Sequence, residues 1–478
     1  MRTRIAIAAA LIGVASLGHA QADQATLDKI VQEGKMNNQV MVHLQDLTTN
    51  IGPRLTASTN LEKAYAWALA KFKEYKLDNV HLEEWGEWPM GFDRGPSTGK
   101  MVVPREVNFQ FTSPSWSKGT DGPLRGPAVP APETIAEFDK YSSLYKGAWI
   151  VYKTPPPRIP RARPGAEPPQ LTPEQVQAQK IEDSLKKAGI LGQVFPSRDE
   201  LTITSGNYNV DPANMPTDVT VTIRKSDMEQ VFGQLDTGNK VELEFNLDHK
   251  FVPGPRKNYN VVAEIKGTEK PDEVVIFGGH LDSWDGPGSQ GAADNGTGTC
   301  TVIEAARILK AVGAKPKRTI RFILFTGEEQ GLFGSRAYVE QHKAEMDKIS
   351  CVFIEDGGAN YEGGTYALAE MVPMFDQIMT TMNKAFPNMP VKMRTVAQMP
   401  RGGGSDHVPF NAIGVPGFFW DETGMFDYGY VHHTQHDRIE LVPYNYMVQS
   451  ATNSAVATYS IACAKTLMPR APKAAPGN

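Results

Sequence analysis

Two runs of apolar, mostly β-branched or aromatic residues stand out in the second half of the chain, at 274–277 and 320–325. Short runs without polar positions are typical of strands that are buried on both faces. A predicted helix at 299–312 connects them. The order of strand and helix then repeats, with strands predicted at 261–265, 350–354 and 415–420 and helices at 332–343, 374–386 and 446–467. This alternation predicts an α/β fold with a mixed central sheet flanked by helices.

The first half of the chain has a different pattern. Residues 23–49 and 61–76 carry apolar side chains at helical spacing, and residues 80–88 alternate like a strand. A Gly-Pro pair at Gly52-Pro53 separates the two helical stretches. We assign residues 23–115 to the N-terminal part of the same α/β domain and residues 253–467 to its catalytic part.

Residues 116–252 predict a separate α+β unit inserted into that domain. Its expected elements are a helix at 181–188 and strands at 147–152, 189–195, 219–223 and 241–245. Within it, Pro155–Pro173 holds eight prolines and several arginines, which predicts an exposed, partly extended loop. A basic docking role for this loop is the alternative.

The two termini have their own signatures. Arg2 and Arg4 precede an apolar run at 5–17, and Ala20-Gln21-Ala22 fits a small-residue cleavage site. Residues 1–22 therefore predict a cleavable signal peptide and a secreted or periplasmic protein, without membrane attachment once the signal is removed. An uncleaved anchor is the alternative. Residues 468–478 are expected to form a disordered tail.

Composition narrows the class of protein further. The net charge of −5 gives no basic footprint for nucleic acid. Only three cysteines occur, which excludes a disulfide scaffold and favours buried thiols, although one bridge stays open. The chain is long enough for two or three domains with an ample core. The oligomeric state is left open, with a homodimer as one option.

Polar residues that bind metals or protons gather where the predicted strands end. Taken singly, each has an ordinary explanation as a turn carboxylate, a charge at a helix N-terminus or a surface histidine. Together they lie in turns of one α/β unit, whose binding sites form at the carboxyl ends of strands. These residues are His280, Asp282, Asp294, Glu328, Glu329, Glu355, Asp356 and the histidines at 432, 433 and 436.

This inventory matches the needs of a site with two zinc ions. Such a site uses a bridging carboxylate, one histidine and one carboxylate for each metal, and a further carboxylate as a base. Zinc lowers the pKa of bound water from 15.7 to about 7 and polarises a carbonyl group, so the sequence predicts a metal-assisted hydrolase.

The motifs as a set resemble the M28 (aminopeptidase Y-like) metallopeptidases. The HLDSWD form is most similar to the carboxypeptidase Q subfamily, which carries a protease-associated (PA) domain where residues 116–252 lie. The resemblance covers about residues 40–465. It rests on His280-Leu-Asp282-Ser-Trp-Asp285, Ala292-Ala-Asp294-Asn-Gly296, Thr326-Gly-Glu328-Glu329-Gln-Gly331, Glu355-Asp356-Gly357, Gly404-Ser-Asp406-His and His433-Thr-Gln-His-Asp437.

The resemblance implies a role for each motif residue. Asp294 would bridge two zinc ions, His280 and Asp356 would complete one site, and Glu329 and His433 the other. Glu328 would be the general base, taking a proton from the water between the metals and passing it to the leaving amine. Asp282 would orient and polarise His280. The peptide bond after Asp294 is expected to be cis.

A second loop resembles the substrate side of the family's site. Gly402–Gly404 would allow close approach of a backbone, and Ser405, Asp406 or His407 would touch the substrate. Tyr430, just before the paired histidines, is a further substrate-binding candidate, as is Tyr428. A structural role for each of these residues is the competing interpretation.

The sequence thus predicts an exported zinc exopeptidase that hydrolyses short peptides or dipeptides with free termini, by aminopeptidase, dipeptidase or carboxypeptidase action. One alternative is a glutaminyl cyclase, a transferase of related fold with a single zinc. Another is a receptor-like relative without catalysis. Retention of every ligand position in this sequence argues against both.

Overall fold

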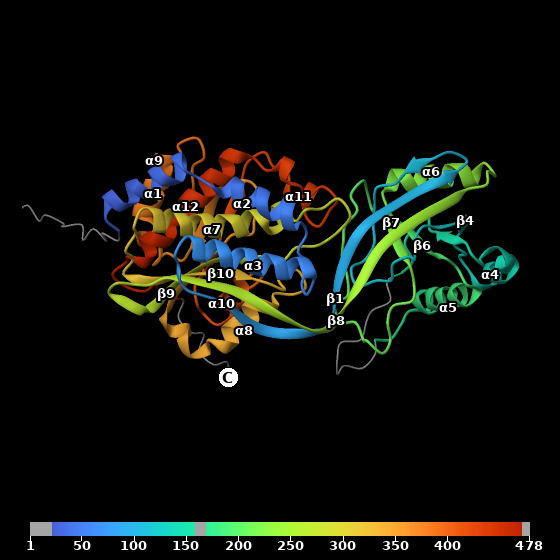
Figure 1. The fold of residues 1–478 in the computed structure, drawn as a ribbon, viewed down its shortest axis with the longest axis horizontal. Helices are drawn as coiled ribbons and strands as arrows, with labels where there is room; N and C mark the ends of the chain where they lie inside the picture. The colour runs from blue at the N-terminus through green and yellow to red at the C-terminus, as the bar shows by residue number, and fades with distance from the viewer. Residues whose placement is uncertain (1–21, 158–168, 471–478) are drawn as a thin grey trace, which may run out of the picture.

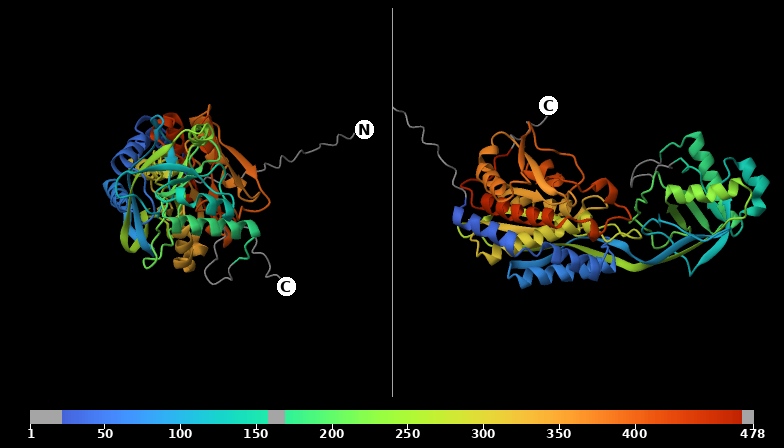
Figure 2. Two further views of the ribbon diagram at one scale, coloured as in Figure 1. Left: turned by 90° about the vertical axis from the view of Figure 1, so that its right-hand side faces the viewer. Right: turned by 90° about the horizontal axis from the view of Figure 1, so that it is seen from above.

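The computed structural model describes residues 22–157 and 169–470 and has two lobes joined by two long strands (Figure 1). Strands β1 (Asp78–Val103) and β8 (Glu242–Ile265) pair antiparallel and run from one lobe into the other. We call residues 22–96 and 248–470 the larger lobe and residues 97–247 the smaller lobe. The view from above shows the same two strands as a continuous connection (Figure 2).

The larger lobe is built on a mixed sheet. Its strands lie in the order β14-β11-β9-β10-β8, in which the first four are parallel and β8 is antiparallel. Alternate side chains face opposite sides, so Val275 and Phe277 enter one core and Val274 and Ile276 another. The parallel strands are β9 (Lys270–His280), β10 (Arg318–Phe325), β11 (Ile349–Ile354) and β14 (Gly417–Phe419).

Helices cover both faces of this sheet (Figure 1). α7 (Thr297–Ala311) is buried along most of its length between the sheet and α12 (Tyr444–Ala462), as expected for a helix that is apolar on nearly all sides. The same face carries α1 (Gln24–Met36), α2 (Val40–Asp46), α3 (Thr59–Glu74) and α9 (Asp376–Ala385). The opposite face carries α8 (Phe333–Gln341) and α10 (Val408–Ala412).

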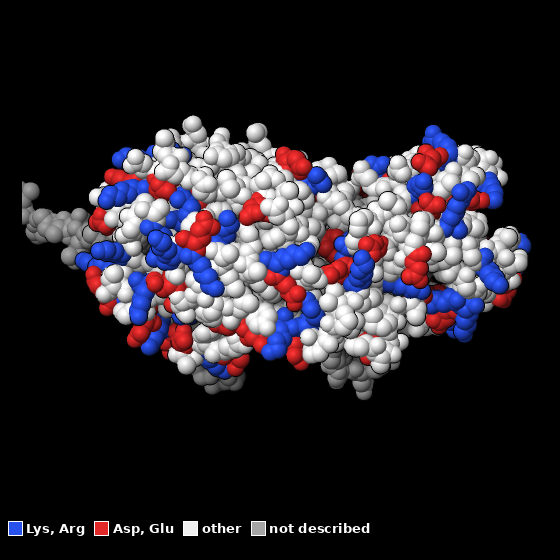
Figure 3. All heavy atoms as spheres, viewed as in Figure 1, with Lys and Arg blue, Asp and Glu red and all other residues white. Residues whose placement is uncertain are grey.

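A three-stranded sheet completes the larger lobe. It consists of β12 (Tyr361–Ala367), β13 (Lys392–Thr395) and β15 (Asp421–Thr423), and the short helix α11 (Tyr428–Val431) follows it. In the part of the chain that the structure describes, no helix is both long and apolar enough to cross a membrane. Acidic and basic side chains are interspersed on the face shown in Figure 3.

The smaller lobe continues the sheet from β8 through β4, β5, β6 and β7 to β3. Its long helix α5 (Pro173–Ala188) begins with a capping box at Thr172 and ends at Gly189, whose φ of 77° suits glycine. The remaining elements are β2 (Val107–Asn108), β3 (Phe111–Thr112), β4 (Leu124–Pro130), β5 (Trp149–Val151), β6 (Gly192–Pro196), β7 (Thr220–Ile223), α4 (Ile135–Tyr141) and α6 (Lys225–Asp236).

An aromatic cluster fills the junction between the lobes. Trp88, Phe92 and Trp284 come from the larger lobe, and Trp116 and Tyr208 from the smaller one. The rings of Trp88 and Tyr208 stack with centroids 4.4 Å apart, and Trp116 meets Trp284 edge to face at 6.4 Å. The two lobes therefore share a core where they meet, in addition to the two long strands.

The structure differs from the sequence predictions in its long elements. The strands predicted at 241–245 and 261–265 are two parts of β8, because pairing with β1 continues through bulges across the proline- and glycine-containing stretch between them. The core of the smaller lobe also includes Met101, Phe109 and Phe111, ahead of the predicted boundary at 116. α6 was not predicted.

The predicted termini are only partly covered. A disordered tail from residue 468 is wrong for its first residues, because Met468 is buried and its N–H donates to Ser350 Oγ. Residues 471–478, the predicted signal peptide up to residue 21 and much of the proline-rich loop lie outside the described residues. Ala22 is buried and its carbonyl accepts a hydrogen bond from Gln377. All three cysteines are free and buried.

Candidate metal centre

Most of the predicted ligands lie at the carboxyl edge of the parallel strands. His280 is the last residue of β9 and stands opposite Phe325 at the end of β10. Asp356 lies two residues beyond β11, and Glu328 and Glu329 occupy the turn after β10. Because neighbouring parallel strands end together, residues separated by up to 76 positions meet at one edge.

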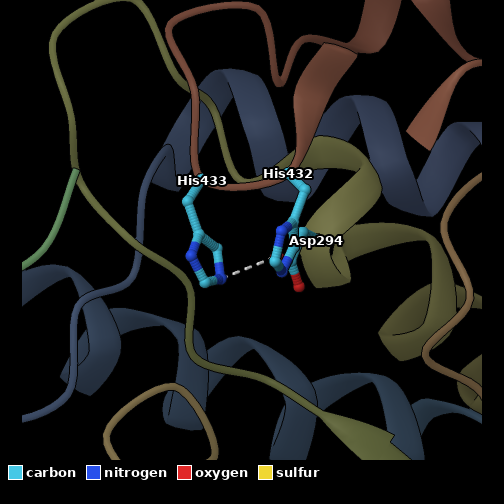
Figure 4. Close-up of side chains that lie close together, drawn as sticks. All are labelled: Asp294, His432 and His433. Carbon is cyan, nitrogen blue, oxygen red and sulfur yellow. Dashed lines mark ion pairs between the residues drawn. The ribbon is translucent and has the colours of Figure 1, made fainter. Parts of the chain in front are cut away.

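Asp294 lies at the centre of this group. It belongs to the turn Ala292–Gly296 that opens α7, and its peptide bond to Asn295 is cis, as the family resemblance implies. Its Oδ1 lies 3.3 Å from His280 Nε2, and its Oδ2 lies 3.3 Å from His433 Nε2. Figure 4 shows the rings of His432 and His433 directed toward Asp294 from a single loop.

The remaining carboxylates divide between two sides of Asp294. On one side, His280 Nε2 lies 3.1 Å from Asp356 Oδ1; we call this pair the His280 half. On the other, His433 Nε2 lies 3.0 Å from Glu329 Oε2; we call this pair the His433 half. The side chain of His280 is 1% exposed and that of His433 is 25% exposed. The two halves share Asp294 and differ in their access to solvent.

The acidic groups of the centre titrate abnormally. Burial and the nearby Asp294 raise the pKa of Glu329 to about 7, and burial also raises the pKa of Asp356. Burial raises the pKa of Glu328 well above its usual range, although His280 opposes this rise. His280 and His433 lower the pKa of Asp294 against the effect of burial. The carboxylates therefore lie close together, and the positive charges near them do not fully balance their negative charge.

The histidines respond to the same crowding. Burial alone would lower their pKa values, but Asp356 and Glu328 raise the pKa of His280, and Glu329 and Asp294 raise the pKa of His433 to about 10. A bound cation would supply the positive charge that protonated imidazoles otherwise provide to these carboxylates.

The donor set fits a metal ion. Nitrogen and carboxylate oxygen atoms of His280, Asp294 and Glu329 lie within 4.8 Å of one another, as do those of Asp294, His432 and His433. Asp294 Oδ2 is buried and accepts no hydrogen bond from the described residues. Within 22–157 and 169–470, no lysine or arginine forms an ion pair with the carboxylates of the centre, which are Asp294, Glu328, Glu329 and Asp356. Imidazole and carboxylate ligands of this kind are typical of zinc.

Asp282 supports the centre through two routes. Its main-chain carbonyl lies 2.9 Å from His280 Nδ1, whereas its carboxylate lies 3.6 Å from that nitrogen. The carboxylate oxygens instead accept the N–H groups of Glu328 and Glu329, both at 3.4 Å, and the hydroxyl of Thr56 at 2.9 Å. The side chain thus orients the turn with both glutamates, and the main chain orients the histidine.

Two supporting residues were not assigned a role from the sequence. Asp437 is buried and accepts the N–H groups of Ala293 and Asp294, at 2.5 and 3.3 Å. Arg54 is fully buried and donates to the carbonyls of Leu281 and Gly291, at 2.6 and 2.8 Å. Arg54 directly follows the Gly-Pro break between the first helices, and Asp437 is the last residue of the motif that begins at His433. Both positions are therefore distinguishable in the sequence.

The residues predicted to touch substrate have mixed surroundings. Ser405, Asp406 and His407 are buried. Burial raises the pKa of Asp406 to about 7, and burial lowers the pKa of His407 to about 4. None of the three presents an open surface in this conformation.

The two tyrosines also differ. Tyr430 stacks on His436, with ring centroids 4.3 Å apart, and is 41% exposed. Tyr428 lies beside the histidine pair, with its ring centroid 5.1 Å from that of His432. Burial and the charges of Asp294 and Asp356 raise its pKa. The structure thus brings Tyr428 to the centre and turns Tyr430 toward His436.

His432 is the second histidine of the pair. Its Nε2 lies 3.9 Å from Asp294 Oδ2, and its ring lies close to that of His433, with centroids 3.8 Å apart and the planes tilted by 31°. Its side chain is 49% exposed, and burial lowers its pKa, in contrast to that of His433. The distances place His433, rather than His432, against both Asp294 and Glu329.

Comparison with known proteins agrees with this centre. Residues 260–458 match the model of peptidase family M28. Carboxypeptidase Q from Mus musculus is 29% identical over 450 residues, which cover 91% of this chain and 88% of the relative. These similarities support an M28 metallopeptidase as the identity of the chain.

Solved structures of M28 peptidases share the fold. A peptidase M28 precursor from Shewanella amazonensis SB2B superposes with a TM-score of 0.66 at 25% identity, covering 94% of this chain and 99% of the other. A zinc aminopeptidase from Bacillus subtilis has the same fold, with a TM-score of 0.55 at 22% identity, covering 88% of this chain and 94% of the other.

These similarities confirm the predicted chemistry at its coarser level. The protein is a metallopeptidase, a hydrolase of the exopeptidase type, and its substrates are peptides. The predicted α/β fold with a mixed sheet flanked by helices is confirmed as well.

Proposed function

We propose that this M28 peptidase is an exported exopeptidase with two zinc ions, which hydrolyses short peptides or dipeptides with free termini. The observation that carries the proposal is the position of Asp294, whose two oxygens each lie 3.3 Å from a different histidine nitrogen. A carboxylate placed in this way can serve two metal ions at once.

The assignment of ligands follows the two halves of the centre. His280 and Asp356 would hold one ion, His433 and Glu329 the other, and Asp294 both. Charge supports the count, because the carboxylates of Asp294, Glu328, Glu329 and Asp356, when all are ionised, would carry four negative charges that two divalent cations would balance. A single ion would leave two buried negative charges without compensation, which is costly in a protein interior.

Glu328 is assigned the role of general base. Its Oε2 lies 3.9 Å from His280 Nε2, its side chain is 10% exposed, and its backbone N–H donates to Asp282. Bound zinc would polarise the scissile carbonyl and lower the pKa of water. Glu328 would take the proton of the attacking water at a carboxylate oxygen and pass it to the amine that leaves. A base of raised pKa suits this transfer near neutral pH.

The smaller lobe and the N-terminus complete the proposal. We infer that the smaller lobe corresponds to a PA-like domain and that residues 1–22 direct export. The catalytic centre lies near the junction of the two lobes, since Trp284, one of the junction residues, meets the His433 ring with centroids 6.0 Å apart. Short substrates would therefore approach between the lobes.

Metal analysis and a small panel of dipeptides test the proposal. Purified protein should contain two zinc ions per chain, and chelation should abolish hydrolysis until zinc is restored. Unblocked dipeptides should be cleaved, and blocking either the amino or the carboxyl terminus identifies the terminus that is required. One zinc per active chain, together with cyclisation of N-terminal glutamine, would establish the cyclase alternative. Activity that survives complete removal of zinc would contradict the proposal.

A further inference from the structure

The loop that carries His433 leaves the larger lobe and meets the smaller one. It follows α11, and His433 adopts a φ of 60°, which is unusual for a residue other than glycine. The carbonyl of His433 accepts a hydrogen bond of 2.8 Å from the N–H of Thr204. Thr204 lies in the segment between β6 and β7 of the smaller lobe. The backbone conformation of this ligand is therefore set in part by the other lobe.

Gln435, two residues beyond His433, makes the main connection. Its Oε1 accepts the N–H and the hydroxyl of Thr202, at 2.9 and 3.0 Å. Its Nε2 donates to Gln110 Oε1 at 3.0 Å and to the carbonyl of Glu200 at 3.1 Å. Gln435 is 9% exposed, and all four bonds go to the smaller lobe. The side-chain amide uses its full capacity of two accepted and two donated hydrogen bonds.

The other ligands are held from within the larger lobe. His280 is bonded through Asp282, the backbone of Asp294 through Asp437, and Glu329 Oε1 through the N–H of Trp284 at 3.2 Å. The His433 half therefore differs from the rest of the centre, because its loop is hydrogen-bonded to residues of the smaller lobe that lie 233 to 325 positions away in sequence.

We propose that Gln435 is a positioning residue for the second metal ion, and that the smaller lobe holds His433 in its ligating conformation through Thr202, Thr204 and Glu200. This inference rests on the proposed function, since it assigns His433 to a metal. Removal of the amide breaks the four side-chain bonds and leaves the bond from the Thr204 N–H to the His433 carbonyl, so more of the ordering of His433 must come from the ion. The affinity of the His433 half for zinc then falls, while the His280 half is unchanged.

The test is a zinc titration of Gln435→Ala against the wild type. Both proteins are dialysed against buffers of defined free zinc, and zinc per chain is measured. Loss of a hydrogen-bonded support of a metal ligand typically costs 10- to 100-fold in metal affinity. We expect the first ion to bind as in wild type and the second to require about 10- to 100-fold more free zinc. Cobalt substitution should show the same loss as a change in the absorption of one of two bound ions.

Two further variants make the result specific. Thr202→Val removes one of the four hydrogen bonds with little change in volume, and should give a smaller shift of the second ion. Asn383→Ala is the matched control, because Asn383 donates to the carbonyl of Val391 at 3.1 Å and accepts its N–H at 2.7 Å. Asn383 lies in α9, at the end of the larger lobe away from the smaller lobe (Figure 1). Its loss should lower stability without changing zinc affinity.

The outcomes separate this inference from the proposed function. Two ions with wild-type affinity in folded Gln435→Ala would overturn the positioning role and leave the dinuclear site intact. A wild type that binds one ion would contradict the proposed function, and the positioning role would then stand only if Gln435→Ala weakens that ion. Should Gln435→Ala fail to fold, Thr202→Val decides, and an unchanged second ion in that variant would overturn the inference.

Discussion

The two halves of the metal centre are alike in chemistry and different in construction. His280 ends β9 and Asp356 follows β11, so the His280 half sits on neighbouring strands of one sheet. His433 lies in a loop, with a left-handed backbone and with hydrogen bonds to the smaller lobe. The His280 half is positioned by one sheet, whereas the His433 half is positioned by hydrogen bonds between the two lobes. Ligands of the same chemical type are therefore held in place by different parts of the structure.

This contrast has a consequence for affinity. The side chains of the His280 half are 1% and 7% exposed, whereas His433 is 25% exposed. A ligand on a rigid, buried strand loses little freedom when a metal binds, while a ligand on an exposed loop loses more unless its neighbours hold it. We therefore expect the two zinc ions to bind with different affinities, with the His433 half as the weaker.

The largest effect should come from Asp294→Asn, which tests whether the halves share one carboxylate. The amide keeps the size of the side chain but loses the negative charge that faces both histidines. We expect both zinc ions to be lost at concentrations that saturate wild type, and activity to fall by about 10⁴-fold, since metal catalysis supplies several kcal/mol. Zinc analysis beside initial rates measures this. Retention of one ion at full affinity would show that the halves are independent.

Glu328→Gln should have the next largest effect on activity and should leave zinc binding in both halves unchanged. The amide cannot accept the proton of the attacking water, so kcat should fall by about 10³-fold. Both zinc ions should remain, because no ligand is changed. The measurement is kcat beside zinc content in the same preparation. Loss of a metal ion would instead identify Glu328 as a ligand and would mean that the roles of Glu328 and Glu329 are exchanged.

Asp282→Asn should affect the two halves unequally. The main-chain bond to His280 stays, but the amide places an NH₂ group against the N–H of Glu328 or Glu329, where the carboxylate accepted both. The turn with Glu329 should shift, and zinc in the His433 half should weaken by about 10- to 100-fold. Thr56→Val, which removes only the hydroxyl bonded to Asp282, should give a smaller loss. Equal weakening of both ions would contradict this assignment.

The smallest expected effect is on the pH dependence of stability, through His249 at the junction between the lobes. Burial and the charge of Arg94 lower the pKa of His249 to about 4. Arg94 donates to His249 at 2.8 Å and pairs with Asp285 at 3.3 Å. The unfolded chain therefore protonates this histidine first, and stability should decrease as pH falls from about 6.5 toward 4, by on the order of 2 kcal/mol.

His249→Gln provides the control for that dependence. The amide does not titrate, so its free energy of unfolding should change less over the same pH range. Denaturant unfolding at pH 7.5 and pH 4.5 compares the two proteins. An identical loss of stability in both would show that His249 does not contribute to the acid sensitivity of the junction.

The sequence was informative where structure follows local pattern. The β-branched runs predicted β9 and β10, and the polar residues after them predicted an edge with His280, Glu328 and Glu329. The structure brings these residues together with Asp294. Such predictions succeed because the alternation of strands and helices sets which strand ends are neighbours.

The remainder depended on contacts between distant segments. Gln435 and Thr202 are separated by 233 positions, and neither carries a pattern that points to the other. The length of β8 was missed because its middle contains prolines and glycine, which local rules place in turns, and only pairing with β1 extends it. Tyr428 and Tyr430 are two residues apart in the short helix α11, so they point in different directions. Which of them faces the ligands depends on how that helix is oriented against the centre.

The long antiparallel pair β1 and β8 should resist bending between the two lobes. A domain inserted through flexible linkers swings on a hinge, but here each crossing strand stays hydrogen-bonded to its partner on both sides of the junction. Approach and separation of the lobes would have to bend this pair of strands, and we expect the bending at the irregular pairings near Trp88 and Arg94. A protease would find no linker to cut between the lobes, and neither lobe could be exchanged as a cassette without rebuilding the strands of the other.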